Sequence, residues 1–277
     1  MVTLMNGLCG FAAIILASHG LGTVREPGVF PQAGLSFLAL AGYLVFLGMV
    51  ADVLDGHVAR ISQSTSSFGA QLDSLCDVIS FGIAPAFLMV RFVEAYSSHL
   101  QSAGRDFAPL PERFVYLIAG VYVMCAIIRL ARFNVETKKD DPHMGFYGLP
   151  TPPAAGVIVS LIVLQQDFPS GFGRWFDLTA DELAAVAIWL LPLVTLAVGI
   201  LMVSRIPYPH AVNRLFRGKK RFSTFLLVMF VIPLMIWNLR LAMAVGFCTF
   251  ALFGPIRWLA LRASRRRRKG PEAALAE

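Results

Sequence analysis

Four aspartates are the residues of this chain best suited to chemistry: Asp52, Asp55, Asp73 and Asp77. They form two pairs, one spaced by three residues and one by four, so the members of each pair share one face of a helix. Carboxylate oxygens suit hard ions such as Mg²⁺ or Mn²⁺. Two such ions about 4 Å apart can hold a phosphate during in-line displacement. The spacing therefore favours transfer of a phosphate-containing group at a centre of two divalent cations.

The four carboxylates converge only if the two helices that carry them are antiparallel neighbours. The polar connection of residues 61–67 is short enough for that arrangement. Four aspartates at membrane depth are costly unless cations neutralise them. Gly56, Ala59 and Gly69 leave space for close helix approach or for a flat nucleotide. The alternative is that the aspartates are ordinary residues of a cytoplasmic loop.

The rest of the chain is too apolar for a soluble domain, with 57% hydrophobic residues and a mean hydropathy of +0.67. The apolar residues form blocks of bilayer-crossing length. These blocks are residues 2–18, 33–51, 69–90, 114–131, 150–166, 183–203, 222–238 and 241–261. We expect an all-α polytopic membrane bundle of about eight transmembrane helices, in which the last two blocks could instead form one re-entrant hairpin. The first block lacks a basic leader and a cleavage site, so we expect it to remain as a span.

Basic residues indicate the orientation in the membrane. Most of the 24 Lys and Arg residues flank the same ends of the apolar blocks as the aspartates, which predicts that this side and both termini are cytoplasmic. The net charge of +7 is concentrated at the ends of spans, which favours anionic lipid headgroups over nucleic acid as partners. The four cysteines and five histidines are scattered and show no metal or redox spacing.

The complete arrangement is D-x2-D-G-x2-A-R-x8-G-x3-D-x3-D, from Asp52 to Asp77. It resembles the defining motif of the CDP-alcohol phosphatidyltransferase family. The resemblance implies that all four aspartates hold two ions, Mg²⁺ or Mn²⁺, on the cytoplasmic side. It also implies that Asp77 activates the hydroxyl of the acceptor alcohol. The residues expected to contact the CDP group are Gly56, Ala59, Arg60, Gly69 and Asn6.

Three further segments resemble bacterial and archaeal members of the family that use serine as the acceptor. They are Thr3–Gly10, Arg129–Asn134 and Gly148–Pro153. The resemblance implies transfer of a phosphatidyl group from CDP-diacylglycerol to L-serine with release of CMP. It also implies a homodimer in the bacterial inner membrane. Other acceptors remain open, namely glycerol phosphate, inositol phosphate and choline.

Arginines beside the acidic pocket suit an acceptor carboxylate or a phosphate. The candidates for this role are Arg129, Arg132, Asn134 and Arg205. These residues also have simpler explanations: the arginines could anchor the ends of spans, and Asn134 could cap a helix. The Gly148–Pro153 segment could likewise be no more than the start of a helix.

The expected organisation is a catalytic core (1–203), additional C-terminal transmembrane helices (204–262) and a basic cytoplasmic tail (263–277). An ion transporter is the alternative outside the enzyme class, since it too would have several spans and buried acids. It predicts discontinuous helices and repeated halves, and the sequence shows neither a repeat nor a second acidic cluster.

Overall fold

The computed structural model describes residues 2–19, 36–62, 67–102, 110–136, 148–167, 180–206 and 238–273. All secondary structure in these ranges is helical, so the all-α class is confirmed for them. The elements are α1 (Val2–His19), α2 (Phe37–Ser62), α3 (Ser67–Asp77), the π-helix η2 (Val78–Ile83), α4 (Ala84–Ser102), α5 (Glu112–Glu136), α6 (Thr151–Asp167), α7 (Ala180–Val203) and α10 (Leu239–Ala273).

Five described segments are long and apolar enough to cross a membrane: Phe37–His57, Phe68–Ser102, Glu112–Val135, Glu182–Val203 and Leu239–Ala260. Two shorter apolar helices, α1 and α6, coincide with the first and fifth predicted blocks. The predicted span at 222–238 lies outside the described residues. The chain therefore has the helices of a membrane protein, while the count of about eight spans stays a prediction.

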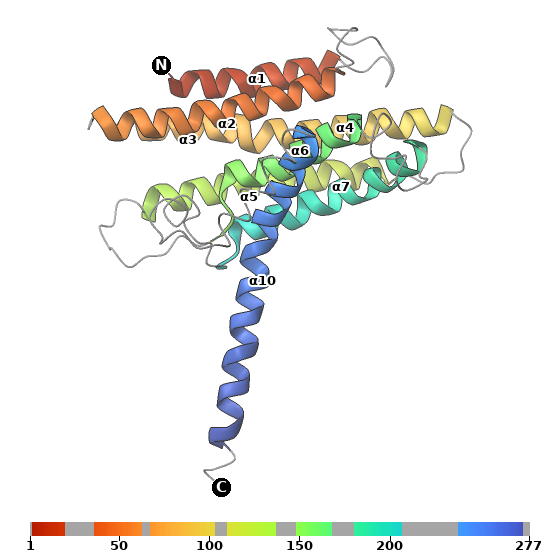
Figure 1. The fold of residues 1–277 in the computed structure, drawn as a ribbon. Helices are drawn as coiled ribbons and strands as arrows, with labels where there is room; N and C mark the ends of the chain where they lie inside the picture. Colours follow the sequence, from red (N-terminus) through yellow and green to blue (C-terminus); the bar gives the residue numbers. More distant parts are fainter. Residues whose placement is uncertain are drawn as a thin grey trace.

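The helices pack around an apolar core in which Phe81, Phe92, Tyr122, Ile158 and Ile188 are at most 1% exposed. Figure 1 shows α1 and α2 side by side at one edge of the bundle, with α5 and α7 at another. Aspartates of α2 and α3 meet, as the sequence predicts, because one carboxylate oxygen each of Asp52, Asp73 and Asp77 lies within 4.8 Å of the other two.

The third predicted span is part of a longer helical run. Residues 67–102 form α3, η2 and α4 without a break, where the sequence predicts a span of 69–90. The π-turn begins directly after Asp77. The hydroxyl of Tyr122 on α5 donates a hydrogen bond to the backbone carbonyl oxygen of Phe81 inside η2 (2.9 Å). Both residues are fully buried, so α5 holds this irregular turn from the protein interior.

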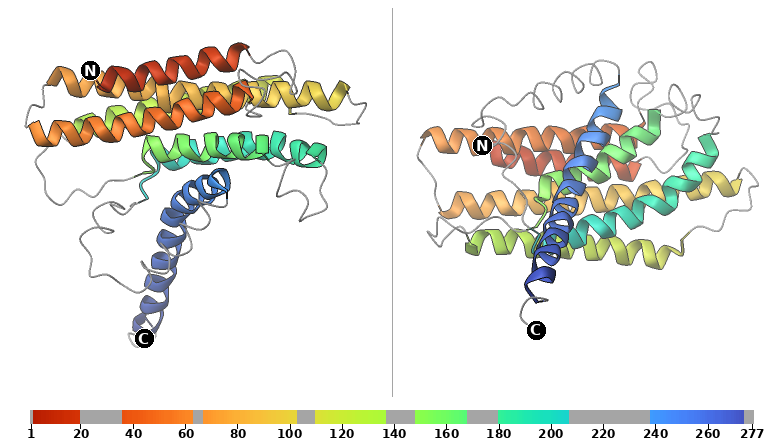
Figure 2. Two further views of the ribbon diagram at one scale, coloured as in Figure 1. Left: turned by 45° about the horizontal axis from the view of Figure 1, so that its top comes forward. Right: turned by 60° about the horizontal axis from the view of Figure 1, so that its bottom comes forward.

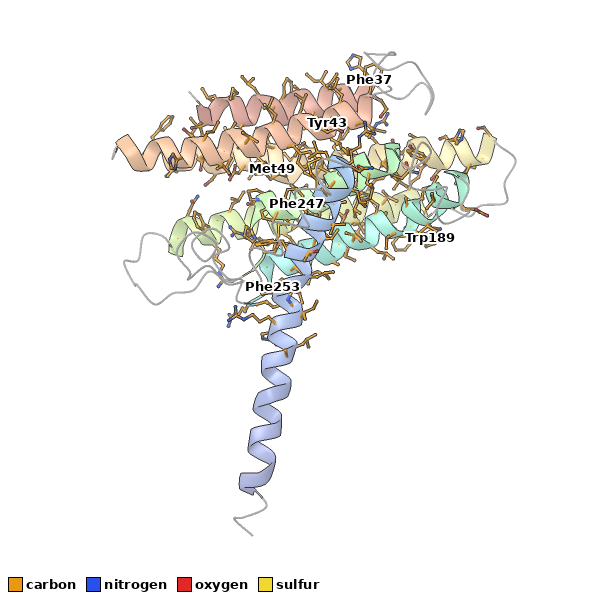
Figure 3. The ribbon with its side chains drawn as sticks, viewed as in Figure 1. Phe37, Tyr43, Met49, Trp189, Phe247 and Phe253 are labelled. Carbon is orange, nitrogen blue, oxygen red and sulfur yellow. The ribbon has the colours of Figure 1, made fainter. Side chains whose placement is uncertain are left out.

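Helix α10 crosses the other helices and projects beyond them toward the C-terminus, as the views of Figures 1 and 2 agree. Its attachment is aromatic and polar. The Phe247 ring stacks on Phe46 of α2 with centroids 5.8 Å apart, and a Cβ at Gly156 of α6 would lie 2.5 Å from the Phe247 ring. The Arg240 Nε donates to the Tyr43 hydroxyl (2.9 Å). Figure 3 shows Phe247 where α10 crosses the bundle and Phe253 farther along the same helix.

Candidate metal centre

Three of the four aspartates meet in one cluster. Asp52 lies on α2, and Asp73 and Asp77 lie one turn apart on α3. One carboxylate oxygen from each of the three lies within 4.8 Å of the other two. Asp77 is 8% exposed, and Asp52 and Asp73 are half-buried. Three negative charges at such distances repel one another strongly in a medium of low dielectric constant.

Asp55 stands beside this cluster, and its carboxylate is held by another helix. Its Oδ2 accepts a hydrogen bond from the hydroxyl of Thr3 on α1. Its charge still interacts with those of Asp52 and Asp73, so it belongs to the same acidic region. The structure thus groups Asp52, Asp73 and Asp77 tightly and leaves Asp55 at their edge.

The cluster fits a divalent cation on chemical grounds. Its donors are all carboxylate oxygens, the ligand type that Mg²⁺ and Mn²⁺ prefer. The mutual repulsion of the carboxylates is offset only when positive charge enters the cluster. The donor set therefore suits a hard cation, with Asp52, Asp73 and Asp77 as the residues able to reach it together.

Asn6 lies beneath the cluster. Its side chain is 0% exposed, and its Nδ2 donates to Oδ1 of Asp77 (2.9 Å). The neighbouring Ser80 of η2 donates from its hydroxyl to the backbone carbonyl oxygen of Asn6 (2.7 Å). The first described helix is therefore hydrogen-bonded to both sides of the junction between α3 and η2.

The predicted nucleotide residues lie around the acidic region on α2 and α3. Gly56 is exposed, and a Cβ there would meet no heavy atom of the described residues within 4 Å. Ala59 and Arg60 are in the last turns of α2, but their side chains lie outside the described ones. Gly69 is half-buried on α3, two turns before Asp77. The open space beside Gly56 shows that helix packing does not require glycine at that position.

Two predicted acceptor residues reach the same region from α5. The Asn134 Nδ2 donates to the hydroxyl oxygen of Ser74 (2.9 Å), which is next to Asp73 in α3. The Arg129 Nε donates to the carbonyl oxygen of Leu149 (2.9 Å), and its guanidinium lies over the Phe133 ring at 5.7 Å. Arg129 also interacts electrostatically with Asp77. Helix α5 thus brings an amide and a guanidinium to the acidic side of α3.

The other two predicted acceptor residues lie on α5 and after α7. Arg132 is half-buried on α5, and Arg205 is exposed in the segment after α7. This segment pairs with the start of α6, because the Gly148 N–H donates to the carbonyl oxygen of Ile206 (2.9 Å). Gly148 has φ +88°, a backbone conformation that favours glycine.

A model of the CDP-alcohol phosphatidyltransferase family matches residues 1–176, which carry the aspartates, Asn6 and the α5 residues. The chain belongs to this family. The match ends before α7, so α7 and α10 lie beyond it.

Curated relatives of this phosphatidyltransferase include enzymes named for a serine acceptor. The chain is 32% identical to the CDP-diacylglycerol–serine O-phosphatidyltransferase of Helicobacter pylori, over 84% of this chain and 85% of the relative. It is 29% identical to the enzyme of the same name from Methanocaldococcus jannaschii, over 78% and 75%. It is 32% identical to the archaetidylserine synthase of Methanothermobacter thermautotrophicus, over 76% and 68%.

Sequence reasoning on this phosphatidyltransferase misses three groups that hold the site residues. They are the Thr3 hydroxyl, the Ser74 hydroxyl and the backbone carbonyl of Leu149. The position of Thr3, three residues before Asn6, offered a signal, since it puts two polar side chains on one face of an apolar helix. Ser74 and the carbonyl of Leu149 carry no such signal, because their partners come from elements distant in sequence.

Proposed function

We propose that this chain is a phosphatidylserine synthase, which transfers a phosphatidyl group from CDP-diacylglycerol to the hydroxyl of L-serine and releases CMP. The observation that carries the proposal is the meeting of Asp52, Asp73 and Asp77 within 4.8 Å in a member of the CDP-alcohol phosphatidyltransferase family. The printed names of the relatives supply serine as the acceptor.

The four aspartates hold two divalent cations, Mg²⁺ or Mn²⁺, in this proposal. When bound, such ions offset the charge of the pyrophosphate and of the departing CMP. The grouping of Asp52, Asp73 and Asp77 supports a shared ion, and the position of Asp55 at the edge supports a role toward a second one.

Asp77 is the residue that accepts the proton of the serine hydroxyl. The serine oxygen forms a bond to the phosphorus that carries diacylglycerol, and the bond from that phosphorus to the bridging oxygen breaks. CMP leaves with the bridging oxygen and its electron pair. Asn6 engages Oδ1 of Asp77, which leaves Oδ2 for the proton or for an ion.

The CDP group lies along the small residues of α2 and α3. Gly56, Ala59 and Gly69 line it, and Arg60 contacts its phosphates. Within the part of the chain that the structure describes, no heavy atom lies within 4 Å of a Cβ at Gly56, which supports this role because a flat base can approach the backbone there.

The acceptor serine binds between α3 and α5. Arg129 and Arg132 contact its carboxylate, Asn134 donates to or accepts from its polar groups, and Arg205 contacts lipid phosphate. The hydrogen bond from Asn134 to Ser74 and the interaction of Arg129 with Asp77 support a site on this side of the cluster. A guanidinium pairs well with a carboxylate through charge-assisted hydrogen bonds.

The wider organisation follows the sequence expectations. Residues 1–203 form the catalytic core, 204–262 add C-terminal transmembrane helices and complete about eight spans, and 263–277 form a basic cytoplasmic tail. The active site and both termini face the cytoplasm of the bacterial inner membrane, and the protein is a homodimer. The apolar helices and the basic residues near span ends support the membrane location.

A single assay tests the proposal. Purified protein in detergent is given CDP-diacylglycerol, Mg²⁺ or Mn²⁺, and one alcohol at a time, and CMP release is measured. We expect release with L-serine and its loss in excess EDTA. Release with glycerol 3-phosphate, an inositol phosphate or choline, but not with serine, would contradict the acceptor. Release that persists in EDTA would contradict the metal centre.

A further inference from the structure

Helix α1 presents two polar side chains to the acidic region: Thr3, and Asn6, for which the family resemblance implies only a contact with the CDP group. We propose that Thr3 and Asn6 are positioning residues that orient the carboxylates of Asp55 and Asp77, so that α1 sets the affinity of the centre for divalent cations. The inference rests on the metal centre of the proposed function and extends it to a helix outside the aspartate motif.

The two residues lie on one face of α1. Thr3 and Asn6 are three residues apart, and Gly7 and Gly10 continue the same face along the next turns. A Cβ at Gly10 would lie 2.6 Å from the Cα of Ser80, and one at Gly7 would lie 3.0 Å from the Cys76 Sγ. Backbone contact this close fixes the position of α1 against α3 and η2.

Each polar side chain of this face reaches a different motif helix. The Thr3 hydroxyl donates to Oδ2 of Asp55 on α2, and the Asn6 amide donates to Oδ1 of Asp77 on α3. The two halves of the aspartate motif are therefore bridged by α1 as well as by their own connection. A change in the position of α1 would move both carboxylates relative to the cluster.

The surroundings of Asn6 support a role for its side-chain amide as a hydrogen-bond donor to Asp77. Its side chain is 0% exposed, and among the described residues its Oδ1 has no hydrogen-bond partner. Gly48 of α2 packs against that oxygen, with a Cβ there only 3.0 Å away. A buried amide oxygen without a partner is unfavourable. The bond from Nδ2 to Asp77 offsets this cost, and it gives Asn6 a task at the carboxylate besides the predicted contact with the CDP group.

Carboxylates that bind metals are commonly held by hydrogen bonds to their second oxygen, which fixes the oxygen that faces the ion. Thr3 and Asn6 each occupy one oxygen in this way. Asp55 and Asp77 are then left with one oxygen each for a cation. Loss of such an outer partner typically lowers metal affinity by about ten- to a hundredfold.

Binding of Mn²⁺ to the purified full chain, without substrate, measures this effect directly. Electron paramagnetic resonance reports free Mn²⁺ during a titration and gives a Kd without any turnover. The variants are Thr3→Val and Asn6→Leu, which keep side-chain shape and remove the donor, and Thr3→Ser, which keeps the hydroxyl. Leu8→Ala is the matched control, because Leu8 is on the same helix and 64% exposed.

We expect the Kd for Mn²⁺ to rise about ten- to a hundredfold in Thr3→Val and Asn6→Leu. It should stay close to the wild-type value in Thr3→Ser and Leu8→Ala. A merely structural role would lower the melting temperature in EDTA and leave the Kd unchanged. If Asn6→Leu fails to fold, Thr3→Val and Thr3→Ser decide the matter alone.

Wild-type affinity in the folded donor-free variants would overturn the positioning role. An equal loss of affinity in Thr3→Ser would also overturn it, since that variant retains the donor. Failure of the proposed function is distinguishable, because wild-type protein would then bind Mn²⁺ and release no CMP with serine. Wild-type protein that binds no Mn²⁺ would overturn the metal centre and this inference with it.

Discussion

Replacing Gly148 with alanine tests how the start of α6 supports the acidic region. Gly148 has φ +88° and is buried, and a Cβ there would lie 2.2 Å from the carbonyl oxygen of Met202. That oxygen belongs to the backbone, so no side-chain rotation can relieve the overlap. Either the 148–150 segment or the end of α7 must move.

The movement removes two backbone hydrogen bonds as well as straining the new residue. These bonds join the Gly148 N–H to Ile206 (2.9 Å) and the Leu149 N–H to Leu201 (3.1 Å). A non-glycine residue in this backbone region costs about 1 to 3 kcal/mol, and each bond contributes about 0.5 to 1.5 kcal/mol. The free energy of unfolding should therefore fall by roughly 2 to 6 kcal/mol.

The effect should extend to activity, because the Leu149 carbonyl accepts the hydrogen bond from Arg129 Nε. Unfolding in mixed detergent micelles gives the stability, and CMP release well below the melting temperature gives the activity. Gly120→Ala is the control, since Gly120 is exposed on α5 and a Cβ there meets no described heavy atom within 4 Å. It should be neutral or slightly stabilising.

A second substitution separates the cost of the positive φ from the cost of the steric overlap with Met202. Asparagine tolerates positive φ better than alanine does, but its Cβ occupies the same place. We expect Gly148→Asn to be as harmful as Gly148→Ala, because the overlap with Met202 dominates. Wild-type stability and activity in Gly148→Ala would refute the reasoning.

Three further substitutions and one labelling experiment on the membrane topology have defined expected results. Asp73→Asn should abolish CMP release even at saturating Mg²⁺ or Mn²⁺, and substantial turnover would contradict the two-metal proposal. The melting temperature without metal should hold or rise in this variant, because one repelling charge is gone. Tyr122→Phe removes the donor to the buried η2 carbonyl, so the free energy of unfolding should fall by about 1 to 3 kcal/mol in detergent. Asn134→Ala should lower kcat/KM for serine about ten- to a hundredfold and leave binding of CDP-diacylglycerol nearly unchanged; equal losses in both would argue against an acceptor role. In a background without native cysteines, Val135→Cys should react with an impermeant maleimide only from the cytoplasmic side and Ser102→Cys only from outside; the reverse pattern would refute the orientation.

Helical spacing and hydropathy predict much of the architecture. They place helices at seven of the eight predicted blocks, and the remaining block, at 222–238, lies almost wholly outside the described residues. The spacing of the aspartates predicts their convergence, and three of the four do converge closely. Hydropathy gives the length of a helix but not its direction. The crossing of α10 over the bundle therefore could not be read from its apolar residues.

The supporting contacts of the site were harder to predict, because they join helices far apart in sequence. A polar residue such as Asn6 in an apolar run indicates a buried partner, but only the packing of α1 identifies that partner as Asp77. The link from Thr3 to Asp55 has the same origin. Residues 78–83 look like ordinary apolar helix, and nothing in their types predicts a π-turn held by Tyr122.

The π-turn also determines how the chain would respond to a change in length. A π-turn of this kind is equivalent to one extra residue in an α-helix, and each residue turns an α-helix by roughly 100°. Deleting one residue within Val78–Ile83 would let α3 and α4 form a single regular helix. Because the π-turn already absorbs that residue as one wider turn, the face that carries Asp73 and Asp77 would keep its direction relative to α4 and its buried side chains. The π-turn therefore lets the chain lose one residue at this point without redirecting the two carboxylates.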